Sequence, residues 1–391
     1  MNTIIRLRRV SLVGLVALLT LARMSSPAKP GHGNSGHQKR ANHYQQINLV
    51  SDIPGLAILD NDSDLVNAWG ISFSPTSPFW ISDNGTGKST LYAVTYDALG
   101  VVQVAKQGLF VNIPGEGNPT GQLFNGTGAF NGDIFIFVSE DGTISGWRSA
   151  LGTSPGTSAE ILLTRPTAVY KGVTLAMTAD GPVLLAANFS EGTIDRYDAS
   201  LNLVQFSDVN APAGYAPFNV QSVADRVFVT FAKQDADKED DVAGRGHGLI
   251  DTFDAQTGDF HRFATGSDAG GKLHEIDSPW GVALAPDTFG RHAGELLVGN
   301  FGSGTIMGFD ATTGEFRGLL QSSEDGHVAI EGLWAITFGN GGRAGRPSTL
   351  YFTAGPDDES HGLFGSLDPV FKDDDDDDEE DQGRILRKTR R

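Results

Sequence analysis

A short motif, in which a glycine turn leads into a brief apolar run, recurs at nearly even intervals along most of this 391-residue chain. Successive copies of one apolar residue in the motif lie 53, 50, 56, 56 and 58 residues apart. A period of about 50 residues with three or four strands per unit is typical of a β-propeller, whereas solenoid repeats are shorter and sandwiches have no period. The six copies of this residue are Leu91, Ile144, Ile194, Ile250, Ile306 and Phe364.

A second expected strand precedes each glycine turn, and these strands are nearly continuous apolar runs. Such runs predict burial on both faces, as in strands enclosed between neighbouring blades. Trp69, Trp280 and Trp334 occupy equivalent places in the first strands, where we expect them to be core between blades and not a ligand platform. The six second strands are expected at Phe79–Asp83, Ile134–Val138, Val183–Ala187, Val227–Phe231, Leu296–Asn300 and Leu350–Ala354.

The sixth unit lacks the fourth strand that ends the other five. An unmatched strand-like run, Gln46–Val50, lies at the other end of the chain. We expect it to supply the outer strand of the sixth blade, which ties the chain ends together and removes an open edge. The expected fold class is therefore all-β, a six-bladed β-propeller with the N-terminal strand closing the last blade. The other fourth strands are expected around Leu109–Val111, Glu160–Leu163, Leu203–Phe206, Phe260–Ala264 and Phe316–Leu320.

The two ends of the chain differ in composition from the repeats between them. Residues 1–28 combine early arginines with an apolar stretch, Val10–Ala22, which is typical of a signal peptide and short for a membrane span. We therefore expect an exported protein, periplasmic or extracellular, with no transmembrane anchor in its mature form. Residues 29–44 are interpreted as a disordered linker, residues 45–368 as the propeller, and residues 369–391 as a disordered tail that is acidic and then basic.

Charge and cysteine content exclude several classes of protein. The formal net charge is −19, and nucleic acid is excluded as a partner because binding a phosphate backbone requires a basic surface. The absence of cysteine excludes thiolate catalysis, zinc–thiolate centres and disulfides. No H-E-x-x-H or P-loop motif is present, and the sequence assigns no catalytic residue.

Several polar residues fall where the propeller pattern places the loops of one face, beside the central channel. Their oxygens are the ligands that Ca²⁺ and Mg²⁺ prefer, so a ring of them predicts a divalent-ion site. The alternative is a role in turns, because Asn and Asp adopt left-handed backbone and form Asx-turns. The candidate metal ligands are Asn67, Asp83, Asn188, Asn219, Asn300 and Glu331.

The turn Lys233–Gly248 in the fourth unit is longer than its counterparts and rich in acids. Its alternating acids are similar to a calcium loop, but Asp240 replaces the expected glycine and Gly246 the expected glutamate. We interpret it as a partner-binding or cation-binding loop on the channel face, with a solvated acidic loop as the alternative. Its acidic residues are Asp235, Asp237, Glu239, Asp240 and Asp241.

Several long stretches resemble a family of exported, functionally uncharacterised six-bladed propellers with NHL-like repeats, known mainly from bacteria. The resemblance is carried by Asn48–Tyr92, Phe231–Asp254, Ser278–Asp310 and Gly332–Gly365, and it covers roughly residues 45–368. It implies a six-bladed propeller and export, and it implies no activity.

A second resemblance is to the metal-dependent lactonases of the gluconolactonase and senescence-marker type. Glu331-Gly-Leu-Trp334 is similar to their Glu-Gly-Pro-x-Trp motif, whose Glu binds the metal. Asn67-Ala-Trp-Gly is similar to part of their Asn-Gly-Ile segment, with two residues inserted after Asn67, and Leu333 replaces the proline of the first motif. The first functional hypothesis is a scaffold that binds a protein or a small ligand. The alternative is a divalent-metal-dependent, lactonase-type hydrolase acting at the channel.

Overall fold

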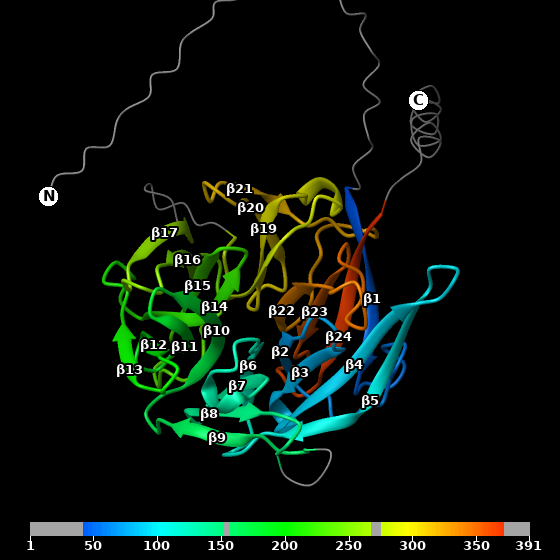
Figure 1. The fold of residues 1–391 in the computed structure, drawn as a ribbon. Helices are drawn as coiled ribbons and strands as arrows, with labels where there is room; N and C mark the ends of the chain where they lie inside the picture. Colours follow the sequence, from blue (N-terminus) through cyan, green and yellow to red (C-terminus); the bar gives the residue numbers. More distant parts are fainter. Residues whose placement is uncertain (1–41, 152–155, 267–274, 371–391) are drawn as a thin grey trace, which may run out of the picture. The chain divides into compact units, whose positions relative to one another are not determined.

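The structure is a computed structural model that describes residues 42–370, apart from 152–155 and 267–274. All strands of this described part belong to six four-stranded antiparallel sheets that follow one another along the chain (Figure 1). The predicted six-bladed β-propeller is confirmed. Within the same residues, no helix has the length and apolar character needed to cross a membrane. The expected signal peptide, most of the linker and nearly all of the tail lie outside the described residues.

Each of the first three blades consists of four consecutive strands, numbered from the channel outward. Blade one contains β2 (Ala68–Ser72), β3 (Phe79–Asp83), β4 (Lys88–Tyr96) and β5 (Val102–Asn112), with the 3-10 turn η1 (Asn84–Thr86). Blade two contains β6 (Pro119–Phe124), β7 (Phe135–Ser139), β8 (Thr143–Trp147) and β9 (Glu160–Thr164), with η2 (Phe130–Gly132). Blade three contains β10 (Tyr170–Thr178), β11 (Gly181–Asn188), β12 (Thr193–Tyr197) and β13 (Leu203–Phe206).

The next blades repeat this order. Blade four contains β14 (Tyr215–Val223), β15 (Arg226–Lys233), β16 (Gly248–Phe253) and β17 (Phe260–Thr265). Blade five contains β18 (Pro279–Leu284), β19 (Glu295–Asn300), β20 (Ile306–Asp310) and β21 (Phe316–Leu319), with η3 (Gly290–His292). Blade six contains β22 (Leu333–Phe338), β23 (Leu350–Ala354) and β24 (Leu363–Val370).

The outer strand of the sixth sheet comes from the other end of the described chain. Strand β1 (His43–Ser51) pairs antiparallel with β24, with His43 opposite Val370, and the blue β1 lies beside the red β24 in Figure 1. The run Gln46–Val50 is part of β1. Because β1 begins at His43 and β24 ends at Val370, the sheet extends two residues beyond each predicted propeller boundary.

Burial follows the expected pattern for stacked blades. All residues of the second strands β3, β7 and β23 are buried, whereas the outermost strands β9 and β13 contain only partly buried and exposed residues. Apolar clusters fill the spaces between the blades. The continuous apolar runs in the sequence thus mark strands covered on both faces.

The three equivalent tryptophans form core, as predicted. Trp69 and Trp334 stack with ring centroids 3.5 Å apart, and Trp280 packs edge-on at 6.4 and 6.2 Å from them. Phe189 and Phe218 belong to the same buried cluster. The cluster joins side chains from five blades around the channel, whereas the sequence analysis had placed these residues between neighbouring blades.

Candidate functional site

The innermost strand of every blade carries a shift in its pairing register at the same place, near the start of the strand. For Lys171, the pairing passes from Tyr170–Asn188 directly to Gly172–Ala187. Such β-bulges re-aim side chains and are common next to functional sites. Four of the six bulge residues are aromatic and one is charged. The six residues are Trp69, Thr120, Lys171, Phe218, Trp280 and Trp334.

Lys171 is the charged member of this set, and its side chain is only 2% exposed. Its Nζ donates to Glu140 Oε1 at 2.5 Å and to Asp240 Oδ1 at 2.9 Å, so carboxylates from blades two and four hold a lysine of blade three. The same Nζ lies 5.3 Å from the ring centroid of Trp69. Burial lowers the pKa of Lys171, but Glu140 and Asp240 raise it above its ordinary value, so the ammonium stays charged.

Hydrogen bonds continue from Glu140 around the mouth of the channel. Asn84 Nδ2 donates to Glu140 Oε2 at 3.0 Å. Asn67 Nδ2 donates to Asn84 Oδ1 at 3.3 Å and to Glu359 Oε2 at 2.6 Å. Trp334 Nε1 donates to Asn67 Oδ1 at 2.8 Å. We call the following residues the channel-mouth cluster: Asn67, Asn84, Glu140, Lys171, Asp240 and Glu359.

A strained turn between β23 and β24 carries Glu359. Asp357, Asp358 and Glu359 have φ values of 56°, 50° and 64°, three consecutive left-handed residues without a glycine. Each such residue costs on the order of 1–3 kcal/mol, and strain of this kind concentrates at functional sites. A Cβ on Gly355 would lie 2.3 Å from Asn67 Oδ1, so glycine is required for the turn to approach Asn67.

Burial raises the pKa of Glu359 to about 7, although the hydrogen bond from Asn67 and the charge of Lys171 act to lower it. The Glu359 carboxyl therefore changes its protonation state near neutral pH. Within the described part of the chain, no hydrogen bond reaches Glu359 Oε1 or Asp240 Oδ2. The cluster thus combines one fixed ammonium, one carboxyl that titrates near neutrality and two free acceptor oxygens.

The raised pKa of Glu359 predicts a specific pH dependence of stability. The folded state binds the Glu359 proton more tightly than the unfolded state does. The stabilisation that this proton gives the folded state is therefore complete below about pH 4.5 and is lost as the pH rises through about 7. The free energy of unfolding of Glu359→Gln minus that of the wild type is therefore expected to be about 2–3 kcal/mol larger at pH 7.5 than at pH 5. Urea unfolding of both proteins at both pH values measures this change. An equal difference at the two pH values would contradict the assignment.

Two of the six predicted metal ligands lie at the channel mouth. Asn67 is the centre of the hydrogen bonds described above and has a left-handed φ of 46°. Glu331 is exposed, and its Oε1 accepts a hydrogen bond of 3.2 Å from the backbone N–H of Asp357. Glu331 therefore supports the strained turn.

The other four predicted ligands have different partners. Asn188 forms hydrogen bonds with Glu191 and Ser190 of its own blade. Asn300 forms one with Thr305 of blade five. Asn219 Nδ2 donates to the carbonyl of Trp280 at 2.8 Å. Asp83 is buried, and burial raises its pKa well above the ordinary value. Among the described residues, no three His, Asp or Glu side chains are placed to hold a metal ion together. A divalent ion held jointly by the predicted ligands therefore remains a prediction.

The acidic loop between β15 and β16 reaches the channel mouth through Asp240. Asp235 accepts a 3.0 Å hydrogen bond from the backbone N–H of Glu239, which stabilises the loop. Burial raises the pKa of Asp241 to about 6, whereas Asp237 and Glu239 are exposed. The loop thus places Asp240 on Lys171, the half-buried Asp241 beside it in the chain, and the exposed Asp237 and Glu239 in solvent.

Sequence analysis missed Lys171, Glu140 and Glu359. The signal for Lys171 was present, because aligning Trp69 and Trp280 with the third repeat places Lys171 at the same position, within Tyr170-Lys-Gly. No comparable signal marked Glu140, which precedes an ordinary Asp-Gly turn.

No protein-family model matches this chain. Two similar proteins come from Acanthamoeba polyphaga mimivirus. The uncharacterized protein R648 is 29% identical over 330 residues, which cover 78% of this chain and 76% of R648. The uncharacterized protein L690 is 27% identical over 351 residues, which cover 84% of this chain and 87% of L690.

Solved structures with a similar chain path include two enzymes. Virginiamycin B lyase from Staphylococcus aureus aligns with a TM-score of 0.46 and 13% identity, covering 84% of this chain and 99% of the lyase. A gluconolactonase from Xanthomonas campestris aligns with a TM-score of 0.44 and 12% identity, covering 85% of this chain and 97% of the gluconolactonase.

Proposed function

We propose that this protein is an exported ligand-binding scaffold and that its ligand site is the channel-mouth cluster. The observation that carries this proposal is the buried Lys171 with its two carboxylates. The fold fills the equivalent position with aromatic side chains in four other blades, so it does not need a charge there. Because a buried ion pair stabilises a protein little more than packed apolar residues of similar volume, the ion pair supports a role in binding.

The charges of the cluster favour a ligand that carries an ammonium or guanidinium group. The cluster holds three carboxyl groups and one ammonium: Glu140 and Asp240 accept hydrogen bonds from Lys171, and Glu359 accepts one from Asn67. The free oxygens of Asp240 and Glu359 can each accept a hydrogen bond from a cationic donor, and such bonds are strong. The exposed acids of the neighbouring loop add negative charge at the rim, which raises the local concentration of cations.

Cationic probes are therefore expected to stabilise the protein. At a hundredfold excess over the Kd, L-arginine or spermidine should raise the Tm by about 3–5 °C, whereas citrate and glucose should not. Differential scanning fluorimetry at pH 7.5 measures these shifts.

The Glu359→Gln variant is expected to lose more than half of the shift. Glu116→Gln is the matched control, because it removes one negative charge from an exposed residue in the loop that leads into blade two on the same face. Equal shifts in both variants would place binding outside the cluster. No shift with any cationic probe would contradict the proposal.

A second candidate is a hydrolase that uses the same cluster, because a carboxyl with a pKa of about 7 suits general acid–base catalysis. A metal-dependent hydrolase does not fit the positions of the predicted metal-ligand side chains. Glu331, Asn67 and Asn188 have separate hydrogen-bond partners, and among the described residues no three His, Asp or Glu side chains are placed to hold an ion together. We derive no metal-dependent step. Hydrolysis of glucono-δ-lactone that is lost in Glu359→Gln would favour the hydrolase over the scaffold.

A further inference from the structure

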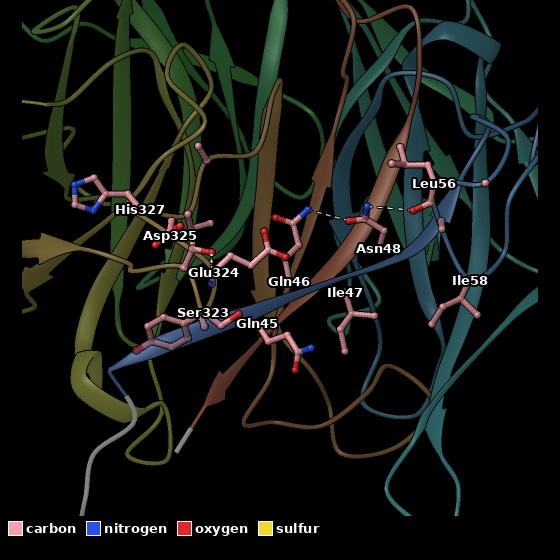
Figure 2. A pocket seen from close by; sticks show the side chains of 16 residues that line it. Gln45, Gln46, Ile47, Asn48, Leu56, Ile58, Ser323, Glu324, Asp325 and His327 are labelled. Carbon is pink, nitrogen blue, oxygen red and sulfur yellow. Dashed lines mark hydrogen bonds between the residues drawn. The ribbon is translucent and has the colours of Figure 1, made fainter. Parts of the chain in front are cut away.

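A groove of about 890 Å³ runs along the outer edge of blade six, away from the channel mouth. Figure 2 shows β1 crossing the groove, with Gln46 and Asn48 on one side of the strand and Ile47 on the other. Gln46 Nε2 donates to Asn48 Oδ1 at 2.9 Å, and Asn48 Nδ2 donates to the carbonyl of Leu56 at 3.2 Å. Because β1 is the outer strand of the sixth sheet, the groove runs along the edge of that strand.

This edge is covered at both ends but open in the middle. The backbone N–H of Tyr44 donates to Gln321 at 2.9 Å, and the carbonyl of Asn48 accepts from Ile58 at 3.1 Å. Alternate residues of an antiparallel strand point their backbone groups to the same side, so those of Gln46 also face the groove. Among the described residues, no backbone hydrogen bond reaches Gln46 from this side. An uncovered strand edge is a template for pairing with another segment.

The two ends of the groove differ in chemistry. Leu56 and Ile58 are 38% and 55% exposed, which leaves apolar surface at one end. Glu324 and Asp325 are exposed at the other end, where Figure 2 shows them beside His327. An occupant that fits both ends combines positive charge with a short apolar stretch.

We propose that the basic end of this chain, residues 384–391, docks in this groove and covers the edge of β1. This segment, RILRKTRR, has five basic residues and places Ile385 and Leu386 between arginines. Its charge complements Glu324 and Asp325, and its apolar pair complements Leu56 and Ile58.

The chain end also has the required reach. Val370 pairs with His43, so the chain leaves its sheet at the Tyr44 end of the groove. Residues 371–383 then span up to roughly 40 Å when extended, whereas the edge from Tyr44 to Asn48 is about 13 Å long. The acidic run 373–381 is repelled by Glu324 and Asp325, which leaves the basic segment as the part that enters.

Disulfide trapping tests this proposal cleanly because the chain has no cysteine of its own. In the full chain at low micromolar concentration, Ile58→Cys combined with Leu386→Cys is expected to form an intramolecular disulfide at least about tenfold faster than the control pair. The control pair is Val209→Cys with Leu386→Cys, because Val209 is 91% exposed and lies between blades three and four. Non-reducing gels measure both rates, and 0.5 M NaCl should reduce the difference.

Deuterium exchange gives a second measurement without cysteines. The Gln46 amide should exchange at least about tenfold more slowly in the full chain than in a chain ending at Gly383. Equal exchange in the two chains, or equal trapping of the two cysteine pairs, would overturn the proposal. Faster trapping of Ile58→Cys by His37→Cys than by Leu386→Cys would also overturn it, because the N-terminal segment would then be the occupant.

Discussion

Replacing Glu140 by glutamine is expected to lower the free energy of unfolding by about 3 kcal/mol, because it leaves a buried ammonium short of one carboxylate. Lys171 is 2% exposed and has Glu140 and Asp240 as its two acceptors. Asp240 is 74% exposed, so Asp240→Asn removes a contact that water partly screens and should cost less than about 1 kcal/mol. Urea unfolding of the two variants at pH 7.5 measures both losses.

A double-mutant cycle separates the ion pair from other effects of the substitution. Lys171→Met alone leaves Glu140 without its cation, but the Lys171→Met/Glu140→Gln double variant carries neither charge. Its loss should therefore be smaller than the sum of the two single losses, by about 1–3 kcal/mol. Additive losses, or a loss for Asp240→Asn as large as that for Glu140→Gln, would show that the pair does not organise the channel mouth.

Replacing Trp334 by alanine is expected to cost about 3–5 kcal/mol, because it opens a cavity in a cluster that joins five blades. The Trp334 ring stacks on Trp69 and on Phe301, with centroids 3.5 and 3.9 Å away. Trp334→Phe keeps much of this packing but removes the hydrogen bond to Asn67, so it should cost less than the alanine variant. Thermal and urea unfolding of both variants measure the losses.

The control for this series is an aromatic residue at the outside of a blade. Phe316 on β21 is 41% exposed, and Phe316→Ala should cost less than about 1 kcal/mol. If Phe316→Ala and Trp334→Ala had similar effects, the channel cluster would not be the centre of the core.

The fold was predictable because a propeller repeats one local pattern. Each blade needs a glycine turn before its third strand and an apolar second strand, and both features recur at a steady interval. The pairing of β1 with β24 also followed from local reasoning, because Gln46–Val50 had no other partner in the repeat. The predicted propeller bounds, 45 and 368, fell inside the observed sheet, which extends to His43 and Val370 because these residues pair with each other.

The site was harder to predict because its contacts join distant parts of the chain. Asn67 bonds to Glu359, 292 positions away, and Lys171 bonds to Asp240, 69 positions away. Each pair joins two different blades and forms only when those blades pack together, so spacing along the sequence does not reveal it. The left-handed turn at 357–359 is also invisible in sequence, where three consecutive acids resemble a solvated loop.

Among the six predicted metal ligands, Asn67 reached the centre of the site, but its role differs from the one expected. It was chosen as a metal ligand on the basis of its amide oxygen. In the structure this oxygen accepts a hydrogen bond from Trp334, and its amide nitrogen donates to Asn84 and Glu359. Asn67 therefore links the aromatic floor of the channel to the acidic rim.

Isothermal titration of spermidine at pH 7 tests most directly whether the channel-mouth cluster binds a cationic ligand. A cation near Glu359 favours the ionised carboxylate, and a group with a pKa of about 7 is half protonated at this pH. Binding should therefore release up to about half a proton, which appears as a dependence of the measured heat on the ionisation enthalpy of the buffer. Glu359→Gln should bind more weakly and release no proton, while Glu116→Gln should behave like the wild type. Heats that do not depend on the buffer, or the same proton release from Glu359→Gln, would contradict the claim.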